Sequence, residues 1–231
     1  MTCEFTHKHY LDTVDEHKKV GTQLLMRHDV DFSLEKAEKL AVLEAVNGIH
    51  SFYFVLFGGS FYSPLTLRNH IRLISLTTLH HRVGLHYQID ITETDAWNLK
   101  YMIHEAQMLQ HILQEPVTIC SQHDVVKSGR PSQEFFQKLE KIPLRDINTY
   151  LKDYKYLSDS GMNWREGCFC KHVGKYDKLM VLTHPIWWND RPISRTMCIS
   201  NWYNHENFKR QNVYKQYMEN LKSYDKRIQR N

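Results

Sequence analysis

Short apolar runs alternate with longer amphipathic stretches along most of this 231-residue chain. The strand-length apolar runs fall at 24–26, 51–57, 82–86, 117–120 and 179–182, with weaker ones at 144–147 and 156–157. Apolar residues recur at helical spacing between them, in 34–41, 65–79 and 99–113, and once more in 206–228. Ser33 is placed to cap the first of these helices, and Gly48 to end it.

This alternation predicts a parallel sheet whose strands are joined by right-handed crossovers. About seven strand–helix units favour a barrel-like sheet over an open one, within the α/β class. We expect residues 1–231 to form a single domain, with a core at about 22–190 and a C-terminal helix at about 205–229. In such barrels the functional residues gather at the C-terminal ends of the strands.

Ionisable residues directly follow several of the predicted strands. They are Asp29 and Asp31 after the first strand, then His86, His123, Asp159 and His184 after later ones. A buried strand that ends in an ionisable group is costly unless the group is paired or binds a metal ion. Each histidine alone is more often structural, but the combination predicts a shared site.

Asp29 and Asp31 lie two positions apart and would face the same way on an extended strand. Two such carboxylates repel, and a divalent cation would relieve the repulsion. One carboxylate could then bind the metal while the other acts as a base. The alternatives are a salt bridge to Arg27 and a helix N-cap formed by Asp31.

Composition narrows the class of protein. The net charge of +4, with much of the excess in 209–230, is too sparse for a nucleic-acid partner. No apolar run reaches the roughly 20 residues of a membrane span, and the first residues do not resemble a signal peptide. Five cysteines without framework spacing predict free thiols and a cytoplasmic location. Fifteen histidines justify the search for a metal site.

Five short motifs resemble those of a divergent branch of the polysaccharide deacetylases, the NodB-homology superfamily. The first motif is the Arg-His-Asp-Val-Asp stretch at 27–31, and the second is the segment 83–87 that contains His86. The third is at 121–123, the fourth at 158–161 followed by Trp164, and the fifth at 182–185 followed by Trp187 and Trp188. Their order agrees with the family pattern from about residue 24 to residue 188, which is most of the chain.

The resemblance implies a distorted (β/α) barrel with fewer than eight strands that hydrolyses an acetyl group from an amino sugar. It implies a divalent metal, Zn²⁺ or a similar ion, held by one Asp and two His. Carried over, Asp29 is the catalytic base, Asp31 a metal ligand and His86 the first metal His. His184 matches the general acid, and Asp159 would orient a catalytic partner or bind a sugar hydroxyl. We expect the substrate platform at Trp164, Trp187 and Trp188, although Trp187 and Trp188 could equally be core aromatics.

This sequence departs from the family pattern at three points. Asp90 stands where the second metal His is usual, so either Asp90 or His123 completes the ligand set. Val30 separates two acidic residues that are usually adjacent, so Asp29 and Asp31 could exchange roles. The Arg that usually supports the base is absent at positions 122 and 124.

These features together predict a metal-dependent hydrolase that removes an N-acetyl group from an amino sugar during surface polysaccharide biosynthesis. A cytoplasmic enzyme of this kind would meet nucleotide-linked or lipid-linked sugars. The alternatives are a non-catalytic carbohydrate-binding module on the same scaffold and a metal-dependent amidohydrolase acting on another small amide.

Overall fold

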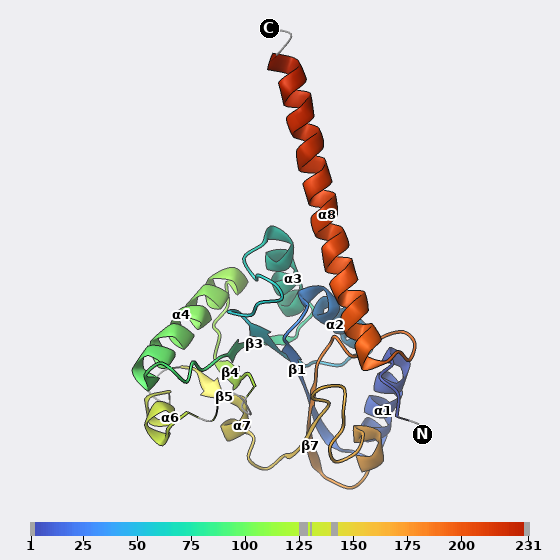
Figure 1. Cartoon of the computed structure of the whole chain (residues 1–231). Helices are drawn as coiled ribbons and strands as arrows, with labels where there is room; N and C mark the ends of the chain where they lie inside the picture. Colours follow the sequence, from blue (N-terminus) through green and yellow to red (C-terminus); the bar gives the residue numbers. More distant parts are fainter. Residues whose placement is uncertain (1–2, 125–128, 130, 140–142, 229–231) are drawn as a thin grey trace. The chain divides into compact units, whose positions relative to one another are not determined.

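Seven parallel strands form one curled sheet in the order β5-β4-β3-β2-β1-β7-β6 (Figure 1). The strands are β1 (Gln23–Val30), β2 (Phe52–Leu56), β3 (Arg82–Tyr87), β4 (Ile119–Gln122), β5 (Arg145–Asp146), β6 (Lys155–Ser158) and β7 (Lys178–Thr183). No strand pair among the described residues joins the two edge strands, β5 and β6, so the sheet is a half-barrel. The predicted α/β class and distorted barrel are confirmed.

The computed structural model describes residues 3–124, 129, 131–139 and 143–228. It divides into two compact units, 1–192 and 193–231. The second unit contains α8 (Arg195–Ile228), which begins before the predicted start at about 205. The assignment of residues 1–231 to one domain stays a prediction. None of the described helices has the length and apolar character needed to cross a membrane.

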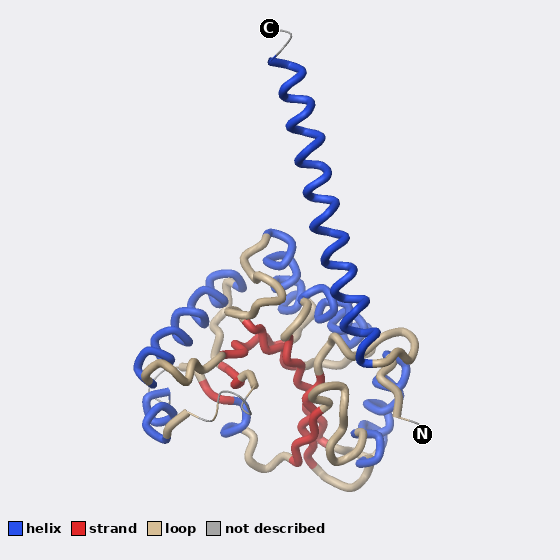
Figure 2. The backbone as a smooth tube through the Cα atoms, in the orientation of Figure 1, coloured by secondary structure: helices blue, strands red, loops and turns tan. Residues whose placement is uncertain are grey.

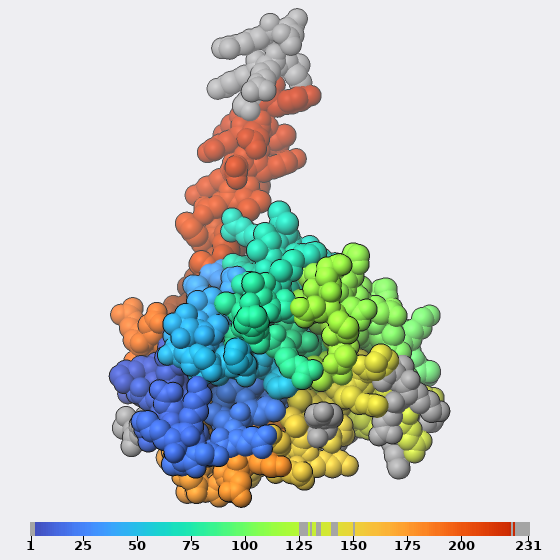
Figure 3. Space-filling view, turned by 180° about the vertical axis from the view of Figure 1, so that it is seen from behind, coloured from blue at the N-terminus to red at the C-terminus, as the bar shows by residue number. Residues whose placement is uncertain are grey.

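Helices cover the convex side of the sheet in the first unit. They are α1 (His7–Lys19), α2 (Leu34–Val46), α3 (Leu67–Thr78) and α4 (Asp95–Leu113). The unit also contains the short α6 (Gln133–Leu139), α7 (Ile147–Tyr150) and η1 (Phe169–His172). Figure 2 shows the strands as a red arc with α1 to α4 outside it. Seen from behind in Figure 3, this unit's surface is largely blue to green, which is the first half of the chain.

The second of these helices shows why the sequence pattern predicted the fold well. The side chain of Ser33 accepts a hydrogen bond from the backbone N–H of Lys36 and so caps α2. Leu34, Ala37 and Ala41 are at most 1 % exposed and pack in the same core cluster as Val30 and Val55 of the sheet. The spacing of these three residues places them on one helix face, which is the pattern that predicted the helix.

Sequence patterning does not reveal α1. Its buried face mixes two apolar residues, Tyr10 and Val14, with the polar residues His9, Thr13 and His17. Apolar periodicity is therefore weak there, although the helix is packed. The packed core consequently begins before the predicted boundary at about residue 22.

The two faces of β1 carry ionisable groups with different partners. His28 points to the helix side, where its Nε2 lies 2.9 Å from Oε1 of the fully buried Glu44. Glu44 also accepts hydrogen bonds from Ser51 Oγ at 2.7 Å and Tyr53 Oη at 2.6 Å. Because side chains alternate along a strand, Arg27 and Asp29 point to the opposite, concave face. A shift of one residue would place every one of these groups on the wrong side, so they specify the register of β1.

Candidate metal and catalytic site

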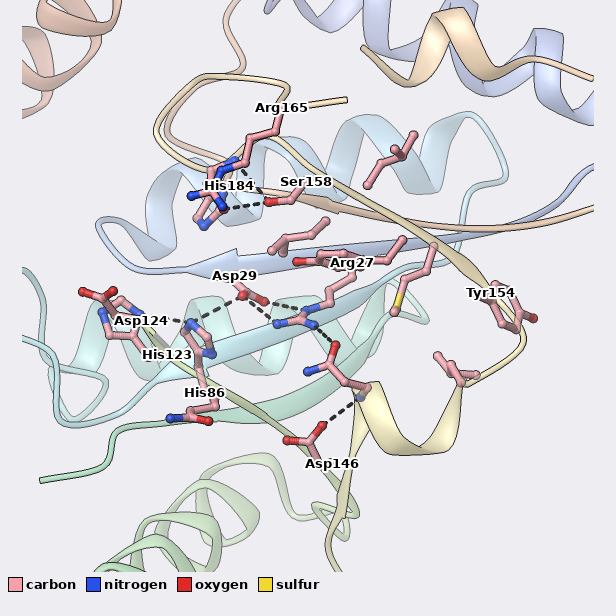
Figure 4. Close-up of a pocket in the computed structure, with 18 of the residues that line it drawn as sticks. Arg27, Asp29, His86, His123, Asp124, Asp146, Tyr154, Ser158, Arg165 and His184 are labelled. Atoms are coloured by element: carbon pink, nitrogen blue, oxygen red, sulfur yellow. Dashed lines mark hydrogen bonds and ion pairs between the residues drawn. The ribbon is translucent and has the colours of Figure 1, made fainter. Parts of the chain in front are cut away.

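Arg27 and Asp29 form a buried bidentate ion pair on the concave face of β1 (Figure 4). Arg27 Nε donates to Asp29 Oδ1 at 2.9 Å, and Nη2 donates to Oδ2 at 2.8 Å. Both residues are 3 % exposed. Burial raises the pKa of Asp29, but the charge of Arg27 outweighs it together with His86, and the net pKa is lowered. Asp29 is therefore an ionised carboxylate with a fixed orientation.

Arg27 supplies the supporting guanidinium that the third motif lacks. Its Nη1 donates to Asn148 Oδ1 at 3.0 Å, and its Nη2 donates to the hydroxyl of Ser121. The cation that holds Asp29 thus comes from the same strand, two residues earlier, rather than from the third motif. The salt bridge to Arg27, which was the alternative to a functional role, is present at Asp29 and does not include Asp31.

Asp31, His86 and His123 bring three ligand atoms together at the ends of β1, β3 and β4. Asp31 Oδ1 lies 3.4 Å from His86 Nε2 and 3.4 Å from His123 Nδ1, and these two nitrogens are 3.2 Å apart. In a tetrahedral zinc site with bonds of about 2.0–2.2 Å, ligand atoms lie about 3.3–3.5 Å apart. The three atoms are therefore spaced as three corners of such a site.

A buried oxygen at the centre of this group lacks a hydrogen-bond donor. No hydrogen bond from the described residues reaches Asp31 Oδ1, which is buried from solvent. An unsatisfied buried carboxylate oxygen is costly in a native structure. A divalent cation would satisfy it, so the residues present fit a metal ion.

Backbone hydrogen bonds hold the His86 ring and the start of the segment that carries His123. His86 Nδ1 lies 3.0 Å from the carbonyl oxygen of Ser121, to which it must donate its proton, so Nε2 is left to face the carboxylates. A backbone hydrogen bond from His123 N to Tyr87 O, at 2.8 Å, fixes the start of the loop after β4. Metal-bound histidines are commonly held in this way through their second nitrogen.

His184 and Asp159 form a second charged pair beside the ligand group. Asp159 is 0 % exposed, and its Oδ1 accepts from His184 Nδ1 at 2.6 Å. The backbone N–H of His184 and the indole N–H of Trp188 also donate to this carboxylate. His184 Nε2 is thereby aimed at the site and lies 3.6 Å from Asp31 Oδ2. Burial lowers the pKa of His184, but the carboxylate of Asp159 outweighs it, and the pKa rises to about 9.

The Asp159–His184 pair predicts a measurable titration. In metal-free protein, the NMR-monitored pKa of His184 should be about 9, and Asp159→Asn should lower it by more than about one unit, towards the free value near 6.5. Asp153→Asn, an exposed carboxylate elsewhere, should leave the His184 curve unchanged. Because the folded pKa is raised, the pair stabilises the fold below about pH 6.5 and this contribution is lost as the pH rises through about 9. An unchanged His184 pKa in Asp159→Asn would contradict this assignment.

A cavity of about 1020 Å³ opens over these groups. It is lined by Asp29, Asp31, His86, His123 and His184, and also by Trp164, Tyr156 and Arg165. This volume is at the upper end of the range for small-molecule sites, about 300–1,000 Å³. Trp164 is half-buried and lies in the wall, as expected for a substrate contact. Tyr156, which patterning did not single out, lies in the same wall on β6, where its 38 % exposure leaves part of the ring accessible.

The predicted platform of Trp187 and Trp188 is wrong. Trp188 is 0 % exposed and packs edge-on against Tyr10, with its indole N–H on Asp159. Trp187 is 5 % exposed and does not line the cavity. Neither ring offers a face to a sugar, because both lie beneath the site as core aromatics.

Asp90 does not complete the ligand set. It lies in the loop between β3 and α4, where its Oδ1 accepts from the backbone N–H and the hydroxyl of Thr92 at 2.9 and 2.6 Å. The group with ligand spacing contains His123 instead. The second imidazole therefore comes from the end of the neighbouring strand and not from one helical turn after His86.

Comparison with known proteins identifies the architecture. No protein-family model and no curated protein sequence matches this chain. Among solved structures, it is similar to a CE4 family pseudoenzyme from Bacillus anthracis, with a TM-score of 0.52, 11 % identity, and coverage of 80 % of this chain and 61 % of that one. The chain thus spans less than two thirds of that neighbour's length.

Two other neighbours are covered more fully. One is a family 4 carbohydrate esterase from Streptomyces lividans in complex with acetate, with a TM-score of 0.51, 11 % identity, and coverage of 81 % of this chain and 89 % of that one. The other is a polysaccharide deacetylase from Bacillus cereus, with a TM-score of 0.52, 9 % identity, and coverage of 80 % and 89 %. The resemblance to polysaccharide deacetylases is therefore confirmed at the level of the fold, which 80–81 % of this chain shares with these structures.

Proposed function

We propose that this protein is a metal-dependent hydrolase that removes an N-acetyl group from an amino sugar. The observation that carries the proposal is the spacing of Asp31, His86 and His123, whose ligand atoms lie 3.2–3.4 Å apart. The Arg27-held Asp29 and the Asp159-held His184 line the same cavity. The similarity in fold to proteins described as carbohydrate esterases and polysaccharide deacetylases supports the same chemistry.

Asp31, His86 and His123 would hold the cation. Two imidazoles and one carboxylate are a common ligand set for zinc in hydrolases, where a further position stays open. When bound, a divalent cation polarises the acyl carbonyl and makes water more acidic. We assign the ligand role to Asp31 because both oxygens of Asp29 already accept from Arg27.

Asp29 would act as the base. It is ionised at neutral pH, and its Oδ2 lies 3.4 Å from His86 Nε2, at the edge of the ligand group. Arg27 keeps this carboxylate pointing at the site while it accepts a proton from water. A base so placed needs no rearrangement before the reaction.

His184 would act as the acid. Hydrolysis of an amide breaks the C–N bond, and the departing nitrogen needs a proton. The raised pKa of His184, about 9, keeps the imidazole protonated at neutral pH. Its Nδ1 proton is engaged by Asp159, so the Nε2 proton is the one that faces the cavity.

The substrate class follows from the cavity. Trp164 and Tyr156 provide aromatic surface on which a sugar ring can stack. We propose a nucleotide-linked or lipid-linked N-acetyl amino sugar, met in the cytoplasm during assembly of a surface polysaccharide. Lys152 and Arg165 in the wall would suit the phosphate of such a carrier.

A non-catalytic carbohydrate-binding role is the second candidate. It is favoured by the similarity in fold to a protein described as a pseudoenzyme. The retention of a base, an acid and three ligand atoms in one cavity favours the enzyme instead.

Acetate release tests this proposal. Purified protein with zinc should release acetate from at least one member of a panel of nucleotide-linked N-acetyl sugars, and Asp29→Asn should abolish the release while sugar binding remains. Binding without release by the wild-type protein would favour the carbohydrate-binding module. Release that survives in Asp29→Asn would remove Asp29 from the role of base.

A further inference from the structure

A second group of metal-ligating side chains lies away from the cavity, at the start of the chain. Cys3, His9 and Cys168 each offer one ligand atom, and these atoms all lie within 4.8 Å of one another. None of the three residues lines the cavity over Asp29. They come from the segment before α1, the first turn of α1 and the residue before η1, so the fold alone brings them together.

The backbone holds this group in place. Thr6 caps α1 by accepting from His9 N at 3.2 Å, and the flanking backbone pairs with the segment after β7 through His7 N to Asn189 O at 2.8 Å and Asn189 N to Phe5 O at 3.2 Å. His9 and Cys168 are 6 % and 2 % exposed. The chain before α1 is therefore docked, and its thiol is brought to a buried imidazole and a buried thiol.

The donor atoms face one another directly. His9 Nε2 lies 3.3 Å from Cys168 Sγ, and the Cys3 thiol lies within 4.8 Å of both atoms. In tetrahedral zinc sites with Zn–S bonds of about 2.3 Å and Zn–N bonds of about 2.0 Å, neighbouring ligand atoms lie about 3.5–3.8 Å apart. Small side-chain movements would give this spacing.

A further thiol lies close by in the sequence. Cys170 follows Cys168 by two residues, within η1, and is half-buried. It is therefore a candidate fourth ligand.

We propose that Cys3, His9 and Cys168 bind a zinc ion in a structural site that fastens the N-terminal segment to the loop before η1. Thiolate and imidazole are the ligands that structural zinc prefers, and soft donors of this kind disfavour calcium and magnesium. The site is separate from the Asp31 group, whose ligands are only nitrogen and oxygen. Its ion would stabilise the fold, because the ligands converge only when the chain is folded.

Cobalt absorption distinguishes the two sites. Reduced, metal-free protein titrated with Co²⁺ should develop thiolate-to-cobalt charge-transfer absorption in the near ultraviolet. The Asp31→Ala variant should keep this band, because no thiolate serves the cavity site. Cys3→Ser should lose it and should bind zinc at this site more than about 100-fold less tightly, since even outer-shell partners of a metal are worth about 10–100-fold.

The variants are chosen so that folding does not decide the result. Cys3 is exposed, so Cys3→Ser should fold normally, whereas Cys168→Ser changes a buried position. Cys198→Ser, in the second unit, removes a thiol outside the group and should keep the band; Cys198 is itself buried, so circular dichroism of this variant checks its fold. Zinc should also raise the Tm of the wild-type and Asp31→Ala proteins more than that of Cys3→Ser.

Three results would overturn the proposal. They are the absence of a thiolate band in reduced wild-type protein, an unchanged band in Cys3→Ser, and zinc binding that occurs only where Asp31 is intact. Loss of acetate release with the band retained would instead count against the proposed function and leave this site standing.

Discussion

Asp31→Ala is expected to abolish zinc binding in the cavity and to lower acetate release by at least about a thousandfold. Asp31 supplies the oxygen shared by His86 and His123, at 3.4 Å from each imidazole nitrogen. Metal-ion catalysis contributes several kcal/mol of transition-state stabilisation, and each 1.36 kcal/mol is about tenfold in rate. Isothermal titration with zinc and an acetate assay on the same preparation measure both effects.

Asp90→Ala is the matched control for this prediction. It removes a carboxylate from the loop after β3, where the Asp90 side chain accepts from Thr92. Zinc affinity and activity should stay within about twofold of wild type, as for other surface substitutions. If Asp90→Ala lost the metal and Asp31→Ala kept it, the ligand assignment would be wrong.

Arg27→Met is expected to lower the free energy of unfolding by about 3–5 kcal/mol, the usual result of removing one partner of a buried ion pair. Asp29 would be left at 3 % exposure without its bidentate partner. The folded-state pKa of Asp29 is lowered below its usual value of about 3.9, so the pair's contribution is present above about pH 4 and is lost as the pH falls below it. The difference between Arg27→Met and wild type should therefore shrink in strong acid. Urea unfolding at about pH 7 and at about pH 3 measures this.

A second substitution isolates the cause of this loss. Arg27→Met combined with Asp29→Asn removes the uncompensated charge and should recover much of the stability, because a buried pair replaced as a whole is often nearly neutral. Equal losses in the single and double variants would mean that Arg27 acts through packing over Phe54, whose ring centroid lies 5.1 Å from its guanidinium carbon.

Much of the fold could be predicted because its strands contain buried apolar runs. The runs that became β2 and β7 are nearly continuously apolar, and β1 and β3 contain shorter apolar segments beside their charged residues. Such runs between amphipathic helices indicate parallel strands. The site followed from the same pattern. Residues that directly follow parallel strands meet at one edge of the sheet, and Asp31, His86 and His123 are found there together.

The residues whose roles were predicted wrongly are those whose burial the sequence does not reveal. Trp187 and Trp188 follow β7 in sequence, but the segment turns under the site, and Trp188 packs against Tyr10 of α1. That helix has a polar buried face, so apolar periodicity did not reveal it or its packing. The roles of Arg27 and Asp90 could not be predicted for a similar reason. Only the structure shows that Arg27 lines the cavity and that Asp90 does not.

The cysteines show how weakly spacing constrains long-range contacts. Five cysteines without framework spacing indicated free thiols. Cys3 and Cys168 lie far apart in the sequence of the first unit. Their thiols come together only because the segment before α1 pairs with the segment after β7.

A crystal structure of the zinc-loaded protein, with anomalous diffraction measured at the zinc edge, tests the central claim most directly. The account predicts an anomalous peak about 2.0–2.2 Å from Asp31 Oδ1, His86 Nε2 and His123 Nδ1. Asp29 should remain bound to Arg27 beside it and should not serve as a ligand. A cavity without a peak at saturating zinc, or a peak held by Asp90 instead, would contradict it.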